Sequence, residues 1–508
     1  MLKKTVRNSV FISFSTLVSL LLGFLFAGMI IRYLGDQRAG FLLTLQSVLA
    51  LGGTVGGLGF GAAAIRKVAA FYKVGDLAQA RSCLGAVFFL NLFTGLLIII
   101  GILVGFPWFF EWSKIDQVLR VDAFYAAIFI ALTFVLQQIS MTYALTYTAL
   151  ERFDLIASLG AGFGLLNGIL GLLTLWLFPK MGALASLSFV LAVVQLSINV
   201  VLVRHLLHGN IVPAWNPLEL RSMIGFGTWA WLANLGGIIN SSVDKITLTT
   251  FLGSASLPYY VVGQRMISQV HAALASQSQF IFPMLAAQGE QAGLMVNKVE
   301  DKLRWFMAFA SAGIYGLLAI ISYPLLAKIV GVEFANRAII PFLLACIQGY
   351  LVAQSIVPYQ ISWGEGRGAP NAIFSLASGL LTISTIILMA PKYGILSASI
   401  AQLWIGPATL ALISWIAVAG KRLSWKSVFR PFCSPTITYL TLLGIAMSSW
   451  LLRFHTRFID WVLMVVVAGF VILFGLFIEW FFFRKYGCIE SLKSVINLLI
   501  SRLQLFVG

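Results

Sequence analysis

The chain has 508 residues, of which 60% are hydrophobic and only 10% are charged. A water-soluble protein carries a far larger share of charge, so this composition excludes a soluble domain and predicts a chain that lies mostly in lipid. The net charge of +17 comes with no basic soluble segment, which excludes nucleic acid as the expected partner.

About fourteen apolar stretches, each long enough to cross about 30 Å of hydrocarbon, follow one another along the chain. Backbone groups in lipid must be paired within their own segment, so we expect an all-α polytopic membrane protein with about 14 transmembrane helices. The predicted spans cover residues 9–31, 40–64, 84–110, 123–148, 156–178, 183–203, 222–251, 257–283, 305–327, 338–362, 371–390, 395–418, 434–452 and 459–482.

The loops between the spans carry most of the positive charge. Basic residues are about twice as frequent on the side that holds both termini, and the positive-inside rule makes that side cytoplasmic. Residues 488–507 are expected to form an amphipathic interfacial helix, because Lys493 and Arg502 interrupt a further span. The four cysteines lack metal-ligand spacing, so no metal site is expected.

The first twelve spans resemble one unit used twice. The loop Pro179-Lys180-Met181-Gly182 joins the fifth and sixth spans, and Pro391-Lys392-Tyr393-Gly394 joins the eleventh and twelfth. We therefore predict two pseudo-symmetric six-helix lobes, at residues 1–210 and 211–420. Two additional helices and the tail fill residues 421–508. Lobes of this kind rock about a central site in many transporters.

Three predicted spans carry polar or small residues at helical spacing along one face. These stripes are Arg265, Ser268, Gln269, Ala272, Ser276 and Gln279 in the eighth span, Asn234, Gly237, Ser241 and Asp244 in the seventh, and Thr133, Gln137, Ser140 and Tyr147 in the fourth. Such stripes indicate either a wet cavity or polar packing between helices.

Charged residues within or beside the spans are the candidate site residues. Arg265 and, on the same face, Gln269 are candidates for binding an anionic substrate, since a guanidinium gives bidentate bonds to phosphate. The alternative is that Arg265 pairs with Asp244 and only ties two spans together. Asp244 is the candidate for coupling to H⁺ or Na⁺. Arg32 and Arg66, at opposite faces of the membrane, are either ligands or interfacial anchors.

These residues resemble a known family. Arg32-Tyr33-Leu34-Gly35, the glycine-rich Gly57–Gly61, Val243-Asp244-Lys245-Ile246 and Tyr259-Tyr260 followed by Arg265 are similar to motifs of polysaccharide-export flippases. Their superfamily includes multidrug antiporters, peptidoglycan-precursor flippases and O-antigen flippases. The resemblance implies two lobes around a central cavity, with Arg265 facing it. Peptidoglycan-precursor flippases are richer in cavity arginines near the first span, whereas here only Arg32 is nearby. The resemblance therefore favours the O-antigen or exopolysaccharide branch.

The resemblance implies a transporter of the bacterial cytoplasmic (inner) membrane, which flips a polyprenyl-diphosphate-linked oligosaccharide by alternating access. Lipopolysaccharide O-antigen synthesis is the expected context, with a glycan polymerase and a chain-length regulator as partners. No catalytic residues or cofactors are expected beyond an H⁺ or Na⁺ gradient. The alternatives are a cation-coupled multidrug antiporter and, with less support, a membrane glycan polymerase or ligase. The outside loops are short and carry no paired-carboxylate motif.

Overall fold

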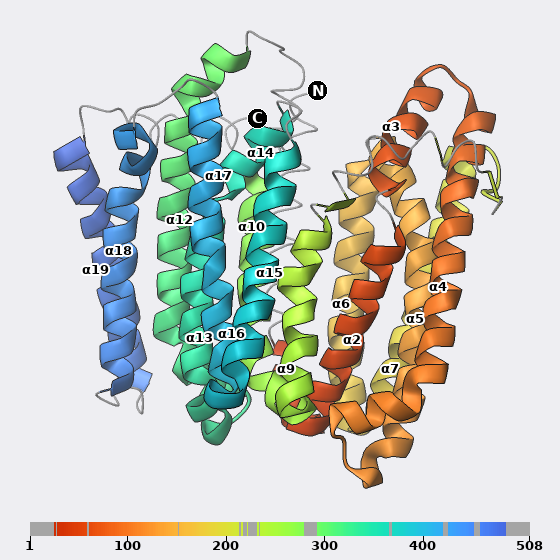
Figure 1. Cartoon of the computed structure of the whole chain (residues 1–508), viewed down its shortest axis with the longest axis horizontal. Helices are drawn as coiled ribbons and strands as arrows, with labels where there is room; N and C mark the ends of the chain where they lie inside the picture. The colour runs from red at the N-terminus through yellow and green to blue at the C-terminus, as the bar shows by residue number, and fades with distance from the viewer. Residues whose placement is uncertain are drawn as a thin grey trace, which may run out of the picture. The chain divides into compact units, whose positions relative to one another are not determined.

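Every regular element among the described residues is helical (Figure 1). The computed structural model describes residues 25–26, 28–57, 60–150, 152–212, 215–216, 221, 231–232, 234–278, 292–364, 368–419, 425–451 and 458–483. The first part of the chain forms α2 (Asp36–Gly57), α3 (Phe60–Lys73), α4 (Leu77–Ser113), η1 (Gln117–Leu119), α5 (Arg120–Ala149), α6 (Phe153–Leu177), α7 (Met181–Leu206), η2 (Ile239–Val243), α9 (Asp244–Leu252) and η3 (Ser254–Ser256). The second part forms α10 (Leu257–Ser278), α12 (Ala292–Ile329), α13 (Val332–Ala353), α14 (Ile356–Gly364), α15 (Gly368–Tyr393), α16 (Ile395–Ala401), η5 (Gln402–Trp404), α17 (Ile405–Ala419), α18 (Trp425–Leu451) and α19 (Phe458–Phe483).

The predicted all-α polytopic fold is confirmed, because 8 described helical segments are long and apolar enough to cross a membrane. They are Leu77–Ser113, Gln117–Ala149, Asp154–Leu177, Met181–Leu206, Leu303–Ile329, Val332–Ser362, Ala369–Tyr393 and Ile395–Ile416. Two shorter apolar helices, Phe432–Ser448 and Met464–Phe477, coincide with the predicted thirteenth and fourteenth spans. Most of the predicted first span and all of the predicted tail helix lie outside the described residues.

Two of the predicted spans are each built from two helices. A proline has no backbone N–H, so the carbonyl four residues earlier loses its helical partner. Pro358 follows the break between α13 and α14, and Pro407 follows the 3₁₀ turn η5 between α16 and α17. Small or polar neighbours, Ser355 and Gly406, adjoin these breaks, whereas Pro107 is accommodated inside the continuous helix α4.

The chain divides into two compact units. The N-terminal unit contains the described residues up to Val261 together with Ser375–Ala401, and the C-terminal unit contains Val262–Phe374 and the described residues from Gln402 onward. Because this division follows spatial contacts rather than sequence repeats, the predicted lobes at 1–210 and 211–420 stay a prediction.

Close packing explains why part of α15 belongs to the N-terminal unit. A Cβ added at Gly236 would meet the backbone of Ser375 and Leu376, and one added at Gly379 would meet Ile239. Small residues of this kind let two helices approach closely in a membrane protein, where lipid offers no hydrophobic drive for association.

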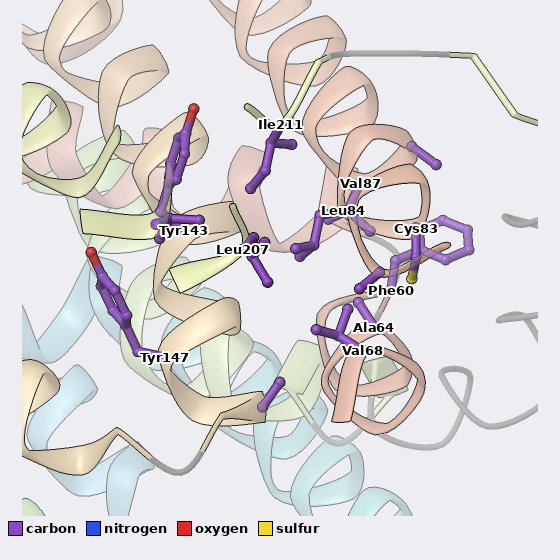
Figure 2. Packing of buried hydrophobic residues seen from close by; sticks show 14 of the residues in the cluster. Phe60, Ala64, Val68, Cys83, Leu84, Val87, Tyr143, Tyr147, Leu207 and Ile211 are labelled. Carbon is purple, nitrogen blue, oxygen red and sulfur yellow. The ribbon is translucent and has the colours of Figure 1, made fainter. Parts of the chain in front are cut away.

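An apolar cluster joins α3, α4, α5 and the end of α7 within the N-terminal unit (Figure 2). Its labelled members are Phe60, Ala64, Val68, Cys83, Leu84, Val87, Tyr143, Tyr147, Leu207 and Ile211. The cluster shows that the helices of the predicted third, fourth and sixth spans pack as one bundle.

The polar stripe on the predicted fourth span is mostly packed between helices. The Tyr147 hydroxyl donates to Asn199 Oδ1 of α7 at 3.0 Å, and both side chains are buried. Thr133 is also buried and donates to the carbonyl of Phe129 in its own helix. Gln137 alone of the stripe is exposed. Interhelical packing, one of the two alternatives for these stripes, therefore accounts for most of this one.

The two Pro-Lys-x-Gly loops, which the predicted repeat makes equivalent, are built differently. In the first, Asp122 of α5 accepts hydrogen bonds from the backbone N–H groups of Met181 and Gly182, each at 2.9 Å, and so satisfies the first turn of α7. In the second, α15 continues through Tyr393, and Gly394 turns the chain with φ of +56°.

Within the C-terminal unit, α12, α13, α18 and α19 run side by side (Figure 1). The rings of Tyr350 on α13 and Tyr439 on α18 are stacked with centroids 4.3 Å apart. A Cβ at Gly316 of α12 would meet the Leu442 side chain, so glycine allows α12 and α18 to approach closely. The two helices beyond the predicted repeat are thus packed onto this unit.

Candidate functional site

Arg265 lies near the middle of α10, on the face that also carries Ser268 and Ala272. It stands eight residues after Leu257, about 12 Å along the helix axis. Its side chain is partly exposed, while Ser268 and Ala272 on the same face are exposed. The predicted stripe is therefore an open polar face over these residues. The Ser276 side chain and Gln279, its last members, lie outside what the structure describes.

Gln269 follows Arg265 by one helical turn. Its side chain is half-buried, and its Oε1 atom has no hydrogen-bond partner. An amide oxygen with spare capacity can accept a hydrogen bond from a hydroxyl or an N–H of a ligand. His271, also on α10, is partly buried, and its Nδ1 atom likewise has no hydrogen-bond partner.

A ladder of three glutamines anchors α10 just before Arg265. Gln264 Nε2 donates to Gln348 Oε1 at 2.7 Å, and Gln348 Nε2 donates to Gln402 Oε1 at 2.9 Å. The ladder links α10 and α13 to the broken helix at η5, and it fixes the rotation of α10 that presents Arg265. Sequence reasoning missed these residues, although three glutamines inside apolar spans were a readable signal.

Asp244 is buried, with 1% of its surface exposed. The Tyr260 hydroxyl donates to its Oδ2 atom, and the Lys245 backbone N–H lies 2.7 Å from its Oδ1 atom. Tyr260 itself belongs to an apolar cluster with Leu248 and Leu257. The two donors and the apolar residues around Tyr260 thus enclose the Asp244 carboxylate.

A π-helical turn separates Asp244 from the rest of the predicted seventh-span stripe. Asn234, Gly237 and Ser241 are exposed, but η2 holds one extra residue in its turn and rotates Asp244 inward. The expectation that Asp244 shares their face is therefore wrong. π-turns are frequent at functional sites, which keeps this segment a candidate.

The predicted pair between Arg265 and Asp244 joins residues of different compact units, and it stays a prediction. The adjacent cation, Lys245, donates from Nζ to the carbonyl of Ser241 one turn earlier. Asn240, inside the π-turn, donates to the Ser375 carbonyl at 3.0 Å and to Ser378 Oγ at 3.1 Å. These bonds attach the π-turn to α15 within the N-terminal unit.

Arg32 and Arg66 lie toward opposite ends of α2. Arg32 is exposed and precedes the turn at Gly35, where φ is +80°. Arg66 is in α3, after the 22 residues of α2, which span about 33 Å; its side chain is outside the described part. The two arginines therefore cannot bind one phosphate group together. No three His, Cys, Asp or Glu side chains gather among the described residues.

An apolar groove runs between α18 and α19, with a volume of about 420 Å³. It is lined by Ile437, Thr438, Thr441, Val467, Phe470, Val471, Phe474 and Gly475. A groove of this composition has the chemistry to hold a hydrocarbon chain.

The fold is shared with membrane transporters of known structure. The structure of the lipid II flippase MurJ in an inward closed conformation matches with a TM-score of 0.70 and 13% identity, over 94% of this chain and 99% of that one. An inward-facing multidrug resistance transporter of the MATE family, in the MOP superfamily, matches with a TM-score of 0.56 and 15% identity, over 85% and 99%. A mutant of the Vibrio cholerae MATE transporter VcmN matches with a TM-score of 0.59 and 16% identity, over 84% and 98%.

These matches show a fold shared with membrane transporters, and the apolar helices define the chain as a multi-pass membrane protein. The family described as polysaccharide biosynthesis protein matches residues 29–338, which is more than half of the chain. The chain therefore belongs to this polysaccharide biosynthesis family. No curated protein sequence gives a significant match.

Proposed function

We propose that this protein flips a polyprenyl-diphosphate-linked oligosaccharide across the cytoplasmic membrane by alternating access. Membership of a polysaccharide biosynthesis family and a fold shared with a lipid II flippase support this substrate class. The observation that carries the proposal is Arg265, a partly exposed guanidinium near the middle of α10, in the predicted eighth span, on a face with the exposed Ser268 and Ala272. Placing it there is costly unless an anion or a wet path meets it.

Each candidate residue has a role in this scheme. Arg265 binds the diphosphate, because its planar fork gives two parallel bonds to phosphate oxygens. Gln269, one turn away, accepts a hydrogen bond from a sugar hydroxyl at its spare Oε1 atom. Arg32 and Arg66 attract the diphosphate at opposite ends of the path, one at a time. The step needs no catalytic group, because no covalent bond changes.

Asp244 couples transport to an H⁺ or Na⁺ gradient. Binding of a proton or a cation to this buried carboxylate favours whichever conformation binds it more tightly. The π-turn before it and the hydrogen bond from Tyr260 place it where a small rearrangement alters its environment.

The cellular setting is proposed from the family and the charge pattern. The substrate is an O-antigen or exopolysaccharide unit, and a glycan polymerase and a chain-length regulator act on it after flipping. The protein lies in the bacterial inner membrane with both termini in the cytoplasm, where lysine and arginine are more frequent in the loops.

A cation-coupled multidrug antiporter is the second candidate function, and the fold shared with MATE transporters favours it. Such a protein requires acidic groups exposed in its path for cationic drugs. Here the acidic candidate is buried, and the open stripe of α10 carries an arginine.

Complementation tests the proposal. A panel of strains, each lacking the flippase for a different surface glycan, would receive the wild type, Arg265→Ala, Arg265→Lys or the control Arg337→Ala. Arg337 is exposed and pairs with Glu333 on the surface of α13, so its loss tests nonspecific effects. We expect at least one strain to regain surface glycan with the wild type and the control. With Arg265→Ala we expect a drop of about tenfold or more, and with Arg265→Lys partial recovery.

Two results would contradict this scheme. Normal surface glycan with well-expressed Arg265→Ala removes Arg265 from the path. Failure of the wild type in every strain, together with increased resistance to cationic drugs, replaces the flippase by the antiporter.

A further inference from the structure

One end of the N-terminal unit joins helices from the two halves of the predicted repeat. There, α2 and α4 come from the first half, and α9, η3 and the start of α10 come from the second. Gly40 of α2 lies so close to η3 that a Cβ would overlap the carbonyl oxygen of Ser254 and crowd Pro258. A glycine is required at this position because the two backbones touch.

Four side-chain contacts surround this backbone contact. Thr44 and Thr249, both fully buried, share a hydrogen bond of 3.0 Å, and the Tyr259 hydroxyl donates to the Asp36 carboxylate. Trp112 Nε1 donates to Thr250 Oγ1 at 3.0 Å, and Lys114 Nζ donates to the Phe251 carbonyl at 3.1 Å. We call these four contacts and the Gly40–Ser254 contact the latch.

The latch contacts the short helix α9. Helix α9 has 9 residues, and it is bounded by the π-turn η2 on one side and by Gly253, with φ of +81°, on the other. Residues at the ends of elements absorb the dihedral changes of hinge motions. The Lys114 ammonium lies at the C-terminal end of α9, where the helix dipole favours a positive charge.

The composition of the latch suits a contact that is made and broken. Apart from the glycine, it consists of hydrogen bonds made by side chains, whose partners water can replace when they separate. The bonds cross from one half of the repeat to the other. By contrast, Asn91 Nδ2 donates to Thr142 Oγ1 at 3.1 Å between α4 and α5 of the same half, and both side chains are buried.

We propose that the latch is a gate, which closes one end of the transport path and separates when the path opens there. This inference rests on the proposed alternating access, in which the two halves move against each other. The start of α2 follows the predicted first span, so the predicted topology puts the gate on the external side. Thr44 and Thr249 form its buried centre, and Gly40 sets its closest approach.

Disulfides test the gate. Thr44→Cys with Thr249→Cys places two thiols where hydroxyls are 3.0 Å apart, which is within reach of an S–S bond of about 2.05 Å after small rotations. The control pair is Asn91→Cys with Thr142→Cys. Both are made in the full chain with Cys433→Ser and Cys488→Ser, which leaves the buried Cys83 and Cys346. Ser241→Cys, an exposed position on the seventh-span stripe, serves as a labelling reporter.

The readout is labelling of the reporter by a membrane-impermeant maleimide added to the outside of cells. We expect oxidation of the Thr44–Thr249 pair to lower external labelling at least fivefold, reversed by dithiothreitol, while the control pair changes it less than twofold. Equal external labelling with and without the disulfide overturns the gate, and so does failure of the disulfide to form. Labelling does not depend on which glycan is carried. If the gate result holds while no strain regains surface glycan, the proposed substrate fails and the gate stands.

A second variant is designed to hold the gate open. Gly40→Ala wedges α2 away from Ser254, and we expect it to raise external labelling of Ser241→Cys at least twofold. Gly105→Ala on α4 is its control, since nothing lies within 4 Å of a Cβ there. Lower or equal labelling with normally expressed Gly40→Ala overturns the gate.

Discussion

The two compact units treat buried polar groups differently. In the N-terminal unit several of them have partners on another helix, as in the pairs Asn91–Thr142 and Tyr147–Asn199, although the Ser254 and Ser399 hydroxyls are buried without one. In the C-terminal unit the Trp305 indole N–H, the Asn371 Oδ1 atom and the Tyr439 hydroxyl are buried without a hydrogen-bond partner. Buried polar groups without partners are rare in native proteins and mark places that hold water or change their packing.

This difference indicates which unit is fixed by directional bonds. Hydrophobic burial gives helices in lipid little reason to associate, so hydrogen bonds and close packing determine the arrangement. The N-terminal unit uses bonds that cross between helices. The C-terminal unit also has such bonds, as in the glutamine ladder, but it buries more polar atoms without a hydrogen-bond partner among the described residues. We therefore expect that removing a buried polar group costs more stability in the N-terminal unit than in the C-terminal unit.

The largest expected effect is at Asp244. Tyr260→Phe removes a donor from a buried carboxylate and should lower the free energy of unfolding by about 3 kcal/mol. Adding Asp244→Asn should recover part of the loss, because a neutral amide costs less to bury than a charged carboxylate. The measurement is the thermal unfolding midpoint of the purified protein. A Tyr260→Phe protein as stable as wild type would show that the hydroxyl contributes little here.

A matched pair of tyrosines tests the comparison directly. Tyr147 and Tyr439 are each 2% exposed, but only the Tyr147 hydroxyl has a partner. Tyr147→Phe leaves Asn199 Oδ1 without its donor and should cost about 1–2 kcal/mol, whereas Tyr439→Phe should be neutral or slightly stabilising. The same unfolding measurement applies to both. Equal effects would remove the distinction between the units.

A smaller effect is expected where α5 meets the start of α7. Asp122→Ala deprives the N–H groups of Met181 and Gly182 of their acceptor, and should cost about 1 kcal/mol. Asp122→Asn keeps one acceptor oxygen and should cost less. Hydrogen exchange of the first turn of α7, followed by mass spectrometry, would detect the change locally. Unchanged exchange in Asp122→Ala would mean that water replaces the carboxylate.

The smallest effect is expected on the surface of the C-terminal unit. Arg337 and Glu333 form an ion pair at 2.8 Å with side chains 59% and 84% exposed. Exposed pairs one helical turn apart contribute about 0.3–0.5 kcal/mol, and salt screens them. Arg337→Ala should therefore shift the unfolding midpoint by less than any variant above. A larger shift would show that this surface is not solvated as its exposure indicates.

The spans were predictable because the length of an apolar run is a direct physical signal. The helices from Leu77 to Leu206 and from Leu303 to Ile416 fall where hydropathy placed them. Interruptions within a span were harder to place, since Pro107 stays inside a helix while Pro358 and Pro407 adjoin breaks. The surrounding helices decide whether a freed carbonyl finds another partner, and the sequence does not contain that information locally.

The candidate site was only partly predictable. The open face of α10 at Arg265 and Ser268 agrees with simple helical spacing. The burial of Asp244 does not, because spacing rules assume 3.6 residues per turn and η2 departs from it. The latch was also missed, since it joins residues more than 130 positions apart, as in Trp112 and Thr250. Such contacts depend on the packing of whole helices.

The π-turn at Ile239–Val243 is also the structure that forms when one residue is inserted into an α-helix. A turn that absorbs one extra residue lets the helix on either side keep its phase, so removing one residue of this segment would restore regular winding and leave Asp244 facing inward. Straightening the turn with every residue kept would instead rotate Asp244 toward the face of Asn234 and Gly237, ten and seven residues earlier. Rewinding of this one turn, with no change in side-chain chemistry, can thus move a carboxylate between the protein interior and the exposed face of the helix.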